Sequence, residues 1–228
     1  MIIYPEGPEA GVSDSPDQIE RFSNLRAAGH ELASKLEQYR HQENLIILGI
    51  VLGGVPVAHE VAQYLGAPFD LIIVRRLLTP QGAGSQICAA TVAGHLVVPD
   101  ELTPLPEKPS TGQDYFIADA LAQLEQRTAT CRGARPPVDV AEKTVLLVDC
   151  GARTGMTMQA AIDALRTRRP RRIIAAMPVV SAGSFETLSD SADELICLAS
   201  PRAFGHVGLW YKDFTRPGDE AVGALLGS

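Results

Sequence analysis

The sequence predicts an α/β fold with three layers, in which helices cover both faces of a mainly parallel sheet. The order strand, glycine turn, helix, strand occurs twice, over residues 45–74 and 144–180, and a crossover of this kind joins parallel strands. The predicted strands are short, continuous apolar runs, which is typical of strands that helices cover on both sides. With 228 residues, 46% of them hydrophobic, the chain is long enough to bury a core as one domain over residues 1–228. In such folds, ligands bind beyond the carboxyl ends of the strands.

Four elements are expected in the first third of the chain. Apolar residues at spacings of three, four and seven predict an amphipathic helix, and the run LIILGIVL has the pattern of a buried strand. Gly53 and Gly54 end that strand, and Pro56 suits the first turn of a helix because its missing N–H needs no partner there. The expected elements are a helix over Asp17–Tyr39, a strand over Leu45–Leu52, a helix over Val55–Leu65 and a strand over Asp70–Val74.

Residues 79–111 form an unusually long connection. They are rich in Gly, Pro and Ser and show little periodicity, although Leu96–Val98 has the composition of a hairpin strand. Two interpretations stay open: a surface excursion, or a flap-like insertion over the ligand site, because the segment follows a strand at the edge where ligands bind. A helix over Tyr115–Arg127 is expected next.

The second strand, turn and helix unit begins with the apolar run Thr144–Val148. A turn containing glycine follows, and apolar residues then recur at helical spacing from Met158 to Leu165. Two more buried strands are expected over Ile173–Val180 and Glu194–Leu198.

The composition excludes several classes of function. The formal net charge of -7 disfavours nucleic-acid and membrane partners, because phosphate groups attract basic surfaces. The four cysteines form no Cys-x-x-Cys pair, so neither a zinc site nor a disulfide framework is indicated. No apolar run approaches the roughly 20 residues of a membrane helix, and the first residues lack the pattern of a signal peptide. We therefore expect a cytoplasmic protein.

The stretch Val145–Thr157, VLLVDCGARTGMT, carries the chemistry. A strand delivers Asp149 to the edge of the sheet, glycines permit a tight turn, and the amides at the start of the next helix face that turn. Unsatisfied helix amides and the helix dipole favour a phosphate group. A carboxylate beside such a site is suited to accept hydrogen bonds from sugar hydroxyls or to contact a bound cation, and a sugar phosphate is the expected ligand. The residues expected to bind it are Ala152, Arg153, Thr154, Gly155, Met156 and Thr157.

These residues resemble the signature of the type I phosphoribosyltransferases, in which an apolar strand precedes two acids, two variable residues and Ala-Thr-Gly-x-Thr. Asp149 matches the first acid, Arg153 stands where the alanine does, and Thr154, Gly155 and Thr157 match the rest. Three further segments are similar to the family: Gly53-Gly54-Val55-Pro56 to its pyrophosphate loop, Arg75-Arg76 to its basic pair, and Phe204–Phe214 to its late base-holding segment. The likeness is greatest to a poorly characterised bacterial branch of predicted phosphoribosyltransferases.

The resemblance implies that phosphoribosyl pyrophosphate and Mg²⁺ bind and that a nitrogenous base or related acceptor receives the phosphoribosyl group. It implies that Asp149 faces the ribose hydroxyls, that Arg75 or Arg76 neutralises the leaving group, and that Gly53 and Gly54 offer amides to pyrophosphate. Trp210 is expected to shape the acceptor pocket, and residues 200–228 are expected to form a C-terminal hood or tail. No residue is assigned as a metal ligand, and a homodimer is expected.

Departures from the signature leave a second function open. Cys150 replaces the second acid, and Val51-Leu52 stands where the bacterial branch has Pro-Arg. A non-catalytic protein that binds or senses a ribose phosphate or nucleotide is the alternative, and Cys150→Asp is expected to strengthen ribose binding in a competent pocket. A thiol hydrolase built on Cys150 would need a base within reach of the sulfur. A dinucleotide dehydrogenase is disfavoured because no Gly-x-Gly-x-x-Gly follows a strand.

Overall fold

A computed structural model describes residues 21–78, 86–92, 95–97, 112–136 and 138–227. Its sheet has seven strands in the order β4-β3-β2-β1-β5-β6-β7. Five neighbouring strands are parallel and two at one edge are antiparallel, which confirms the predicted mainly parallel α/β fold. The strands are β1 (Leu45–Ile50), β2 (Phe69–Leu78), β3 (Gln86–Val92), β4 (His95–Val97), β5 (Thr144–Val148), β6 (Arg172–Val179) and β7 (Glu194–Ala199).

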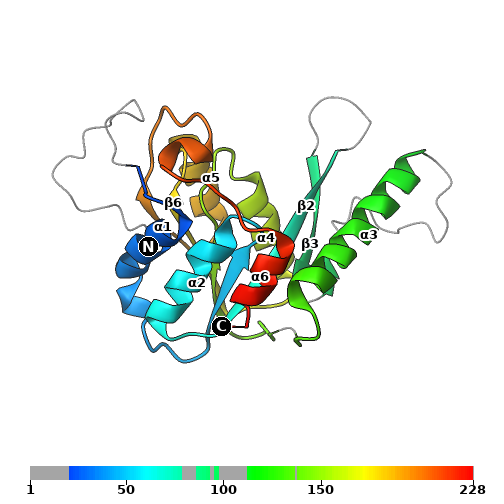
Figure 1. Ribbon diagram of the computed structural model, residues 1–228, viewed down its shortest axis with the longest axis horizontal. Helices are drawn as coiled ribbons and strands as arrows, with labels where there is room; N and C mark the ends of the chain where they lie inside the picture. The colour runs from blue at the N-terminus through cyan, green and yellow to red at the C-terminus, as the bar shows by residue number, and fades with distance from the viewer. Residues whose placement is uncertain (1–20, 79–85, 93–94, 98–111, 137, 228) are drawn as a thin grey trace.

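Helices cover both faces of the sheet, as Figure 1 shows. On one face lie α1 (Leu25–Lys35), α2 (Gly54–Leu65) and α3 (Gly112–Arg132), with α6 (Asp219–Leu225) packed against α3. On the other face lie α4 (Met156–Arg166) and α5 (Ala182–Ser191). Two short 3₁₀ helices, η2 (Glu37–Tyr39) and η4 (Val207–Trp210), complete the described helices.

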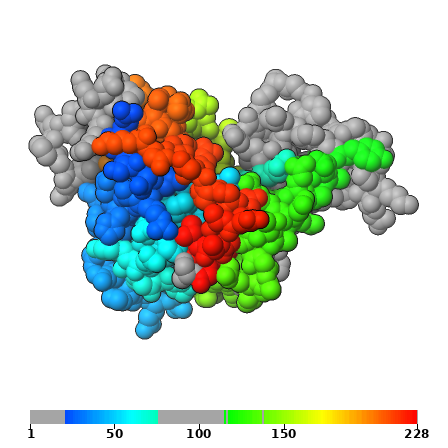
Figure 2. Space-filling view, viewed as in Figure 1, coloured from blue at the N-terminus to red at the C-terminus, as the bar shows by residue number. Residues whose placement is uncertain are grey.

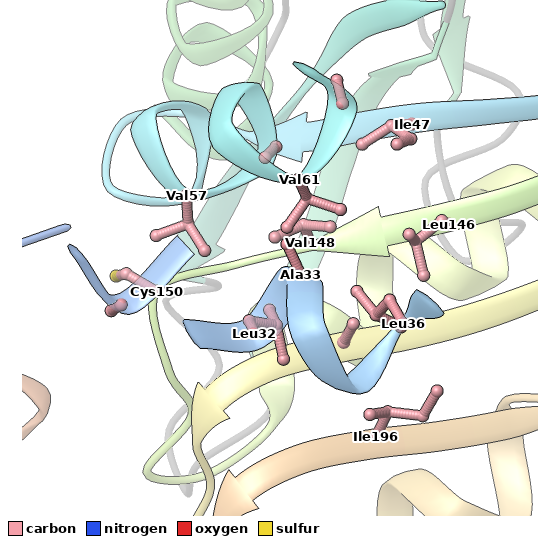
Figure 3. Packing of buried hydrophobic residues seen from close by; sticks show 14 of the residues in the cluster. Leu32, Ala33, Leu36, Ile47, Val57, Val61, Leu146, Val148, Cys150 and Ile196 are labelled. Carbon is pink, nitrogen blue, oxygen red and sulfur yellow. The ribbon is translucent and has the colours of Figure 1, made fainter. Parts of the chain in front are cut away.

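Strand β5, the middle one of the five parallel strands, shows why helices must cover both faces of the sheet. All five of its residues are buried, and alternate side chains point to opposite faces. Leu146 and Val148 pack with residues of α1 and α2, as Figure 3 shows, whereas Val145 and Leu147 pack against α4. Burial of each such side chain contributes about 1.5–3 kcal/mol, so both helical layers stabilise the strand that carries the site.

The first helix begins later than the sequence predicts. Asn24 caps α1, because its side chain accepts a hydrogen bond of 2.9 Å from the amide of Ala27. Phe22, expected within the helix, instead forms a bridge with Tyr211 near the other end of the chain. The expected start of the helix at Asp17 lies outside the described residues.

The connection after β2 adds strands to the sheet. β2 extends to Leu78, beyond the expected end at Val74, and β3 and β4 continue the sheet in antiparallel fashion. The predicted hairpin strand at Leu96–Val98 corresponds to β4 at His95–Val97. Residues 79–85, 93–94 and 98–111 lie outside the described part, so a flap over the site remains a prediction.

The C-terminal segment crosses one face of the molecule. In Figure 2 it runs in orange and red from the region of α1 towards the green α3. Trp210 donates from Nε1 to the carbonyl of Phe204 at 3.1 Å, and the Tyr211 hydroxyl donates to the carbonyl of Cys150 at 2.5 Å. The second bond holds the segment at Tyr211 beside the loop that follows β5. Among the described helices, none combines the length and the apolar character that crossing a membrane requires.

Candidate functional site

A cavity of about 440 Å³ lies at the carboxyl edge of the parallel strands. Strand register explains why distant segments meet there: Gly49 of β1 pairs with Val148 of β5, so the loops that follow both strands start at the same level. The cavity is lined by residues 50–53, 149–158 and 206–208, together with Val74, Phe214 and Arg216. The structure thus brings Gly53, Asp149 and the whole predicted turn 152–157 together.

The turn before α4 presents amides to the cavity. Gly155 adopts φ 71 and caps the helix without any side-chain hydrogen bond. The amide of Gln159 is the first to bond within the helix, donating to the carbonyl of Gly155 at 2.8 Å. The amides of Met156, Thr157 and Met158 donate to no acceptor among the described residues. These donors lie at the positive end of the helix dipole, which favours an anion.

Bonds to the start of α5 fix this turn. The carbonyl of Arg153 accepts hydrogen bonds from the hydroxyls of Ser181 at 2.7 Å and Ser184 at 2.8 Å. The amide of Ala152 donates to the carbonyl of Val179 at 3.0 Å, and that of Ser181 donates to the carbonyl of Ala152 at 2.9 Å. The Arg153 side chain stays exposed at the cavity, so its charge is available to a bound anion.

Two glycines allow the loop after β1 to approach the loop after β5. A Cβ on Gly54 would lie 2.6 Å from the carbonyl oxygen of Val148, and one on Gly53 would lie 2.6 Å from Sγ of Cys150. Neither position accommodates a larger residue without movement. Gly53 lines the cavity, but Gly54 does not, so the structure gives Gly54 a packing role at the start of α2. The Val51–Leu52 peptide bond in this loop is cis.

Asp149 lies on the cavity wall with an unusual pKa. One oxygen, Oδ1, accepts the amide of Cys150 at 2.7 Å. Burial raises the pKa of Asp149 to about 6, against the lowering effects of the Cys150 amide and the Arg216 charge. The carboxylate is therefore mostly charged at neutral pH. In that form it can accept hydrogen bonds from the hydroxyl groups of a sugar.

Cys150 is a neutral thiol in this setting. Burial and then the neighbouring Asp149 charge raise the pKa of Cys150 well above its usual value. A reactive cysteine needs a lowered pKa, whereas here the interaction with the adjacent Asp149 carboxylate raises the pKa of Cys150 further, so the site gives the thiol hydrolase hypothesis no support.

Two residues expected at the site, Arg75 and Trp210, do not line the cavity. Arg75 alternates with Val74 along β2 and shares the face of Leu71 and Ile73, which pack towards α3. The Arg76 side chain lies outside the described part. Trp210 is fully buried in the core, where it packs on the ring of Phe204, and it does not line the cavity.

The cavity also contains side chains that the sequence did not single out as ligand contacts. His206, Phe214 and Arg216 line it from the C-terminal segment. Arg216 lies two residues beyond the segment that resembles the family, and His206 has no acidic neighbour in sequence that would mark it. His206 and Phe214 belong to the segment that resembles the family's base-holding segment, whereas only the fold, which lays the chain across the edge of the sheet, brings Arg216 to the site.

A sequence model described as the phosphoribosyl transferase domain matches residues 15–209. A Mycobacterium tuberculosis protein named "Putative phosphoribosyl transferase Rv0571c" is 31% identical over 205 residues, which are 90% of this chain and 46% of that protein. The crystal structure of TT1426 from Thermus thermophilus is similar with a TM-score of 0.73 and 35% identity, covering 90% of this chain and 97% of that one. The chain spans about half the length of the curated relatives it matches.

Proposed function

Because the chain belongs to the phosphoribosyl transferase domain family, we propose that it binds phosphoribosyl pyrophosphate in the cavity and transfers the phosphoribosyl group to a nitrogenous acceptor. The observation that carries this proposal is the meeting of the α4 amide turn, Asp149 and the Gly53 loop at one sheet edge. These parts suit three parts of one ligand: a phosphate monoester, a ribose and a pyrophosphate.

Different residues of the cavity would bind different parts of this ligand. The amides of residues 156–158 and the hydroxyls of Thr154 and Thr157 would hold the 5′-phosphate, while the Asp149 carboxylate would accept hydrogen bonds from the ribose hydroxyls. In the reaction, a nitrogen lone pair forms a bond to the anomeric carbon as the bond from that carbon to pyrophosphate breaks. Catalysis of this reaction would come largely from holding the acceptor and phosphoribosyl pyrophosphate together in one cavity. Fixed hydrogen-bond donors around the negative charge of the leaving pyrophosphate would accelerate it further.

The donor set of the cavity fits a magnesium ion that arrives with the ligand. Asp149 is the sole carboxylate among the described residues that line the cavity, and the described residues contain no cluster of three potential metal ligands. Mg²⁺ often uses one carboxylate, waters and substrate phosphates rather than an all-protein site. When bound, the ion would neutralise charge on the pyrophosphate oxygens, and Asp149 would contact its waters or the ion.

One observation favours a second function, binding without transfer. The neutral thiol of Cys150 stands where the resembling family has a second acid, so the cavity offers one carboxylate to ribose rather than two. A protein with this cavity could sense a ribose phosphate or nucleotide without turnover.

Location in the cytoplasm and assembly as a homodimer complete the proposal, and the buried free thiols of Cys131 and Cys197 are compatible with a reducing compartment.

Pyrophosphate release tests the proposal. The protein is incubated with phosphoribosyl pyrophosphate, Mg²⁺ and a panel of purine, pyrimidine and related nitrogenous acceptors, and Asp149→Asn serves as the matched control. Acceptor-dependent release that falls on the order of a hundredfold in the control supports transfer. Binding by calorimetry without release from any acceptor favours the sensing function, and absence of binding contradicts both.

A further inference from the structure

Arg216 lies at the cavity on the side of the Gly53 loop. Its Cδ is 3.9 Å from the point where a side chain on Gly53 would begin, and its guanidinium carbon is 4.8 Å from the centre of the Phe214 ring. Both Arg216 and Phe214 line the cavity. The ring therefore supports the guanidinium beside the loop, in the arrangement that favours a cation over an aromatic face.

The charge of Arg216 is not used in an ion pair with any described residue. Arg26, Arg127 and Arg166 each pair with a carboxylate within 4.0 Å, but no such pair forms at Arg216 among the described residues. Its field reaches the cavity instead, since it lowers the pKa of the Asp149 carboxyl against the effect of burial. The cavity thus contains a cation that is available to an anionic ligand.

Backbone donors lie beside this cation. The amides of Leu52 and Gly53 donate to no acceptor among the described residues, and α2 begins at Gly54 with no side-chain cap. A guanidinium beside helix-start amides is a strong combination for phosphate oxygens, because charge-assisted bonds add to the amide donors. The α4 turn with Arg153 forms a comparable group of donors at the other loop, so donors suited to an anion lie at two places on the cavity wall.

We propose that Arg216 is a substrate-binding residue that holds the pyrophosphate end of the ligand against the Gly53 loop. This inference rests on the proposed function and assigns to Arg216 a role that the family resemblance implies for Arg75 or Arg76. Arg75 lies on the opposite face of β2, whereas Arg216 lines the cavity itself. The hood thereby supplies the cation for the leaving group from the C-terminal end of the chain.

Calorimetry with two probes tests this assignment. Inorganic pyrophosphate with Mg²⁺ probes the Gly53 subsite, and ribose 5-phosphate probes the α4 turn. The variants are Arg216→Gln, which removes the charge, and Arg216→Lys, which keeps it; Arg202→Gln is the matched control, an exposed arginine of the same segment outside the cavity. Arg216→Gln is expected to weaken pyrophosphate binding by about tenfold or more, with ribose 5-phosphate binding changed less than about twofold and a smaller loss in Arg216→Lys.

The outcomes separate this inference from the proposed function. Wild-type protein that binds both probes while Arg216→Gln binds pyrophosphate equally well overturns the role of Arg216 and leaves the function standing. An equal loss for both probes, or an equal loss in Arg202→Gln, shows a diffuse charge effect and also overturns the assignment. Wild-type protein that binds neither probe contradicts the proposed function and the inference together.

Discussion

The pKa of Asp149 links its burial to the pH dependence of stability. An unfolded aspartate has a pKa near 3.9, whereas in the folded protein burial raises the pKa of Asp149 to about 6. The folded state therefore holds a proton more tightly than the unfolded chain. The cost of keeping Asp149 charged is absent below the unfolded pKa, grows as the pH rises towards 6, and is complete above it.

Asp149→Asn is expected to remove this cost. From about pH 4.5 to about pH 7.5, the free energy of unfolding of the variant should rise relative to wild type by about 1–2 kcal/mol. The asparagine Oδ1 can still accept the Cys150 amide, so the local fold is retained. Urea unfolding of both proteins at the two pH values measures the difference. A difference that does not change with pH would show that the carboxyl group is not desolvated in the folded state.

The sequence and the structure lead to opposite expectations for the variant Cys150→Asp. Sequence resemblance suggests a gain in ribose binding, because the substitution restores the second acid. In the structure, Sγ of Cys150 lies against Gly53, and the new carboxylate would be buried next to Asp149. We expect a loss of roughly 2–4 kcal/mol in the free energy of unfolding, measured by urea unfolding, and a loss below about 1 kcal/mol in Cys150→Ser. Unchanged stability with tighter ribose 5-phosphate binding would refute this expectation.

At the scale of elements, the contact between the loops after β1 and β5 holds the site together. Gly54→Ala places a methyl group 2.6 Å from the Val148 carbonyl oxygen, so one loop must move. The expected cost is about 1–3 kcal/mol, with weaker pyrophosphate binding. Gly183→Ala is the control, because a Cβ at Gly183 meets nothing within 4 Å and alanine favours the helix. Thermal unfolding and calorimetry check both variants; equal stability of the two would mean that the loops are not tightly apposed.

The elements also show why some of the fold was predictable and some was not. β1, β5 and β6 are buried on both faces, so their continuous apolar runs identify them in the sequence. β3 lies at the antiparallel side of the sheet in a Gly- and Pro-rich region, where pairing with β2 rather than local pattern defines it. The short helix α6 is held by contact with α3, which no local periodicity reveals. The turn 151–157 was predictable because its glycines and threonines lie within seven residues of sequence, whereas Arg216 reaches the site only through the path of the C-terminal segment.

On the scale of the whole molecule, a buried ion pair attaches α3 to the sheet. The guanidinium of Arg132 donates to both oxygens of Asp70 in β2, at 2.7 and 3.0 Å, and both side chains are almost fully buried. The same carboxylate accepts the amide of Val138 at 3.0 Å, which fixes the chain between α3 and β5. The pair therefore joins the outer part of the molecule to the central sheet.

Arg132→Ala is expected to lower the free energy of unfolding by roughly 3–5 kcal/mol, because it leaves the Asp70 carboxylate buried without its partner. Arg135→Ala, at an exposed arginine of the same region, should cost less than about 1 kcal/mol. Urea unfolding compares the two variants. A small loss in Arg132→Ala would show that water reaches Asp70 when the guanidinium is removed.

The central claim is that the backbone amides at the start of α4 bind a phosphate monoester. The most direct measurement follows backbone amide chemical shifts during a titration with ribose 5-phosphate, with ribose as the control that lacks the phosphate. The account predicts that ribose 5-phosphate changes the chemical shifts of the amides of residues 154–158 most, and that these changes saturate together. Ribose alone should leave the same chemical shifts unchanged. Amides that stay unmoved while others shift, or an equal response to ribose, would contradict the account.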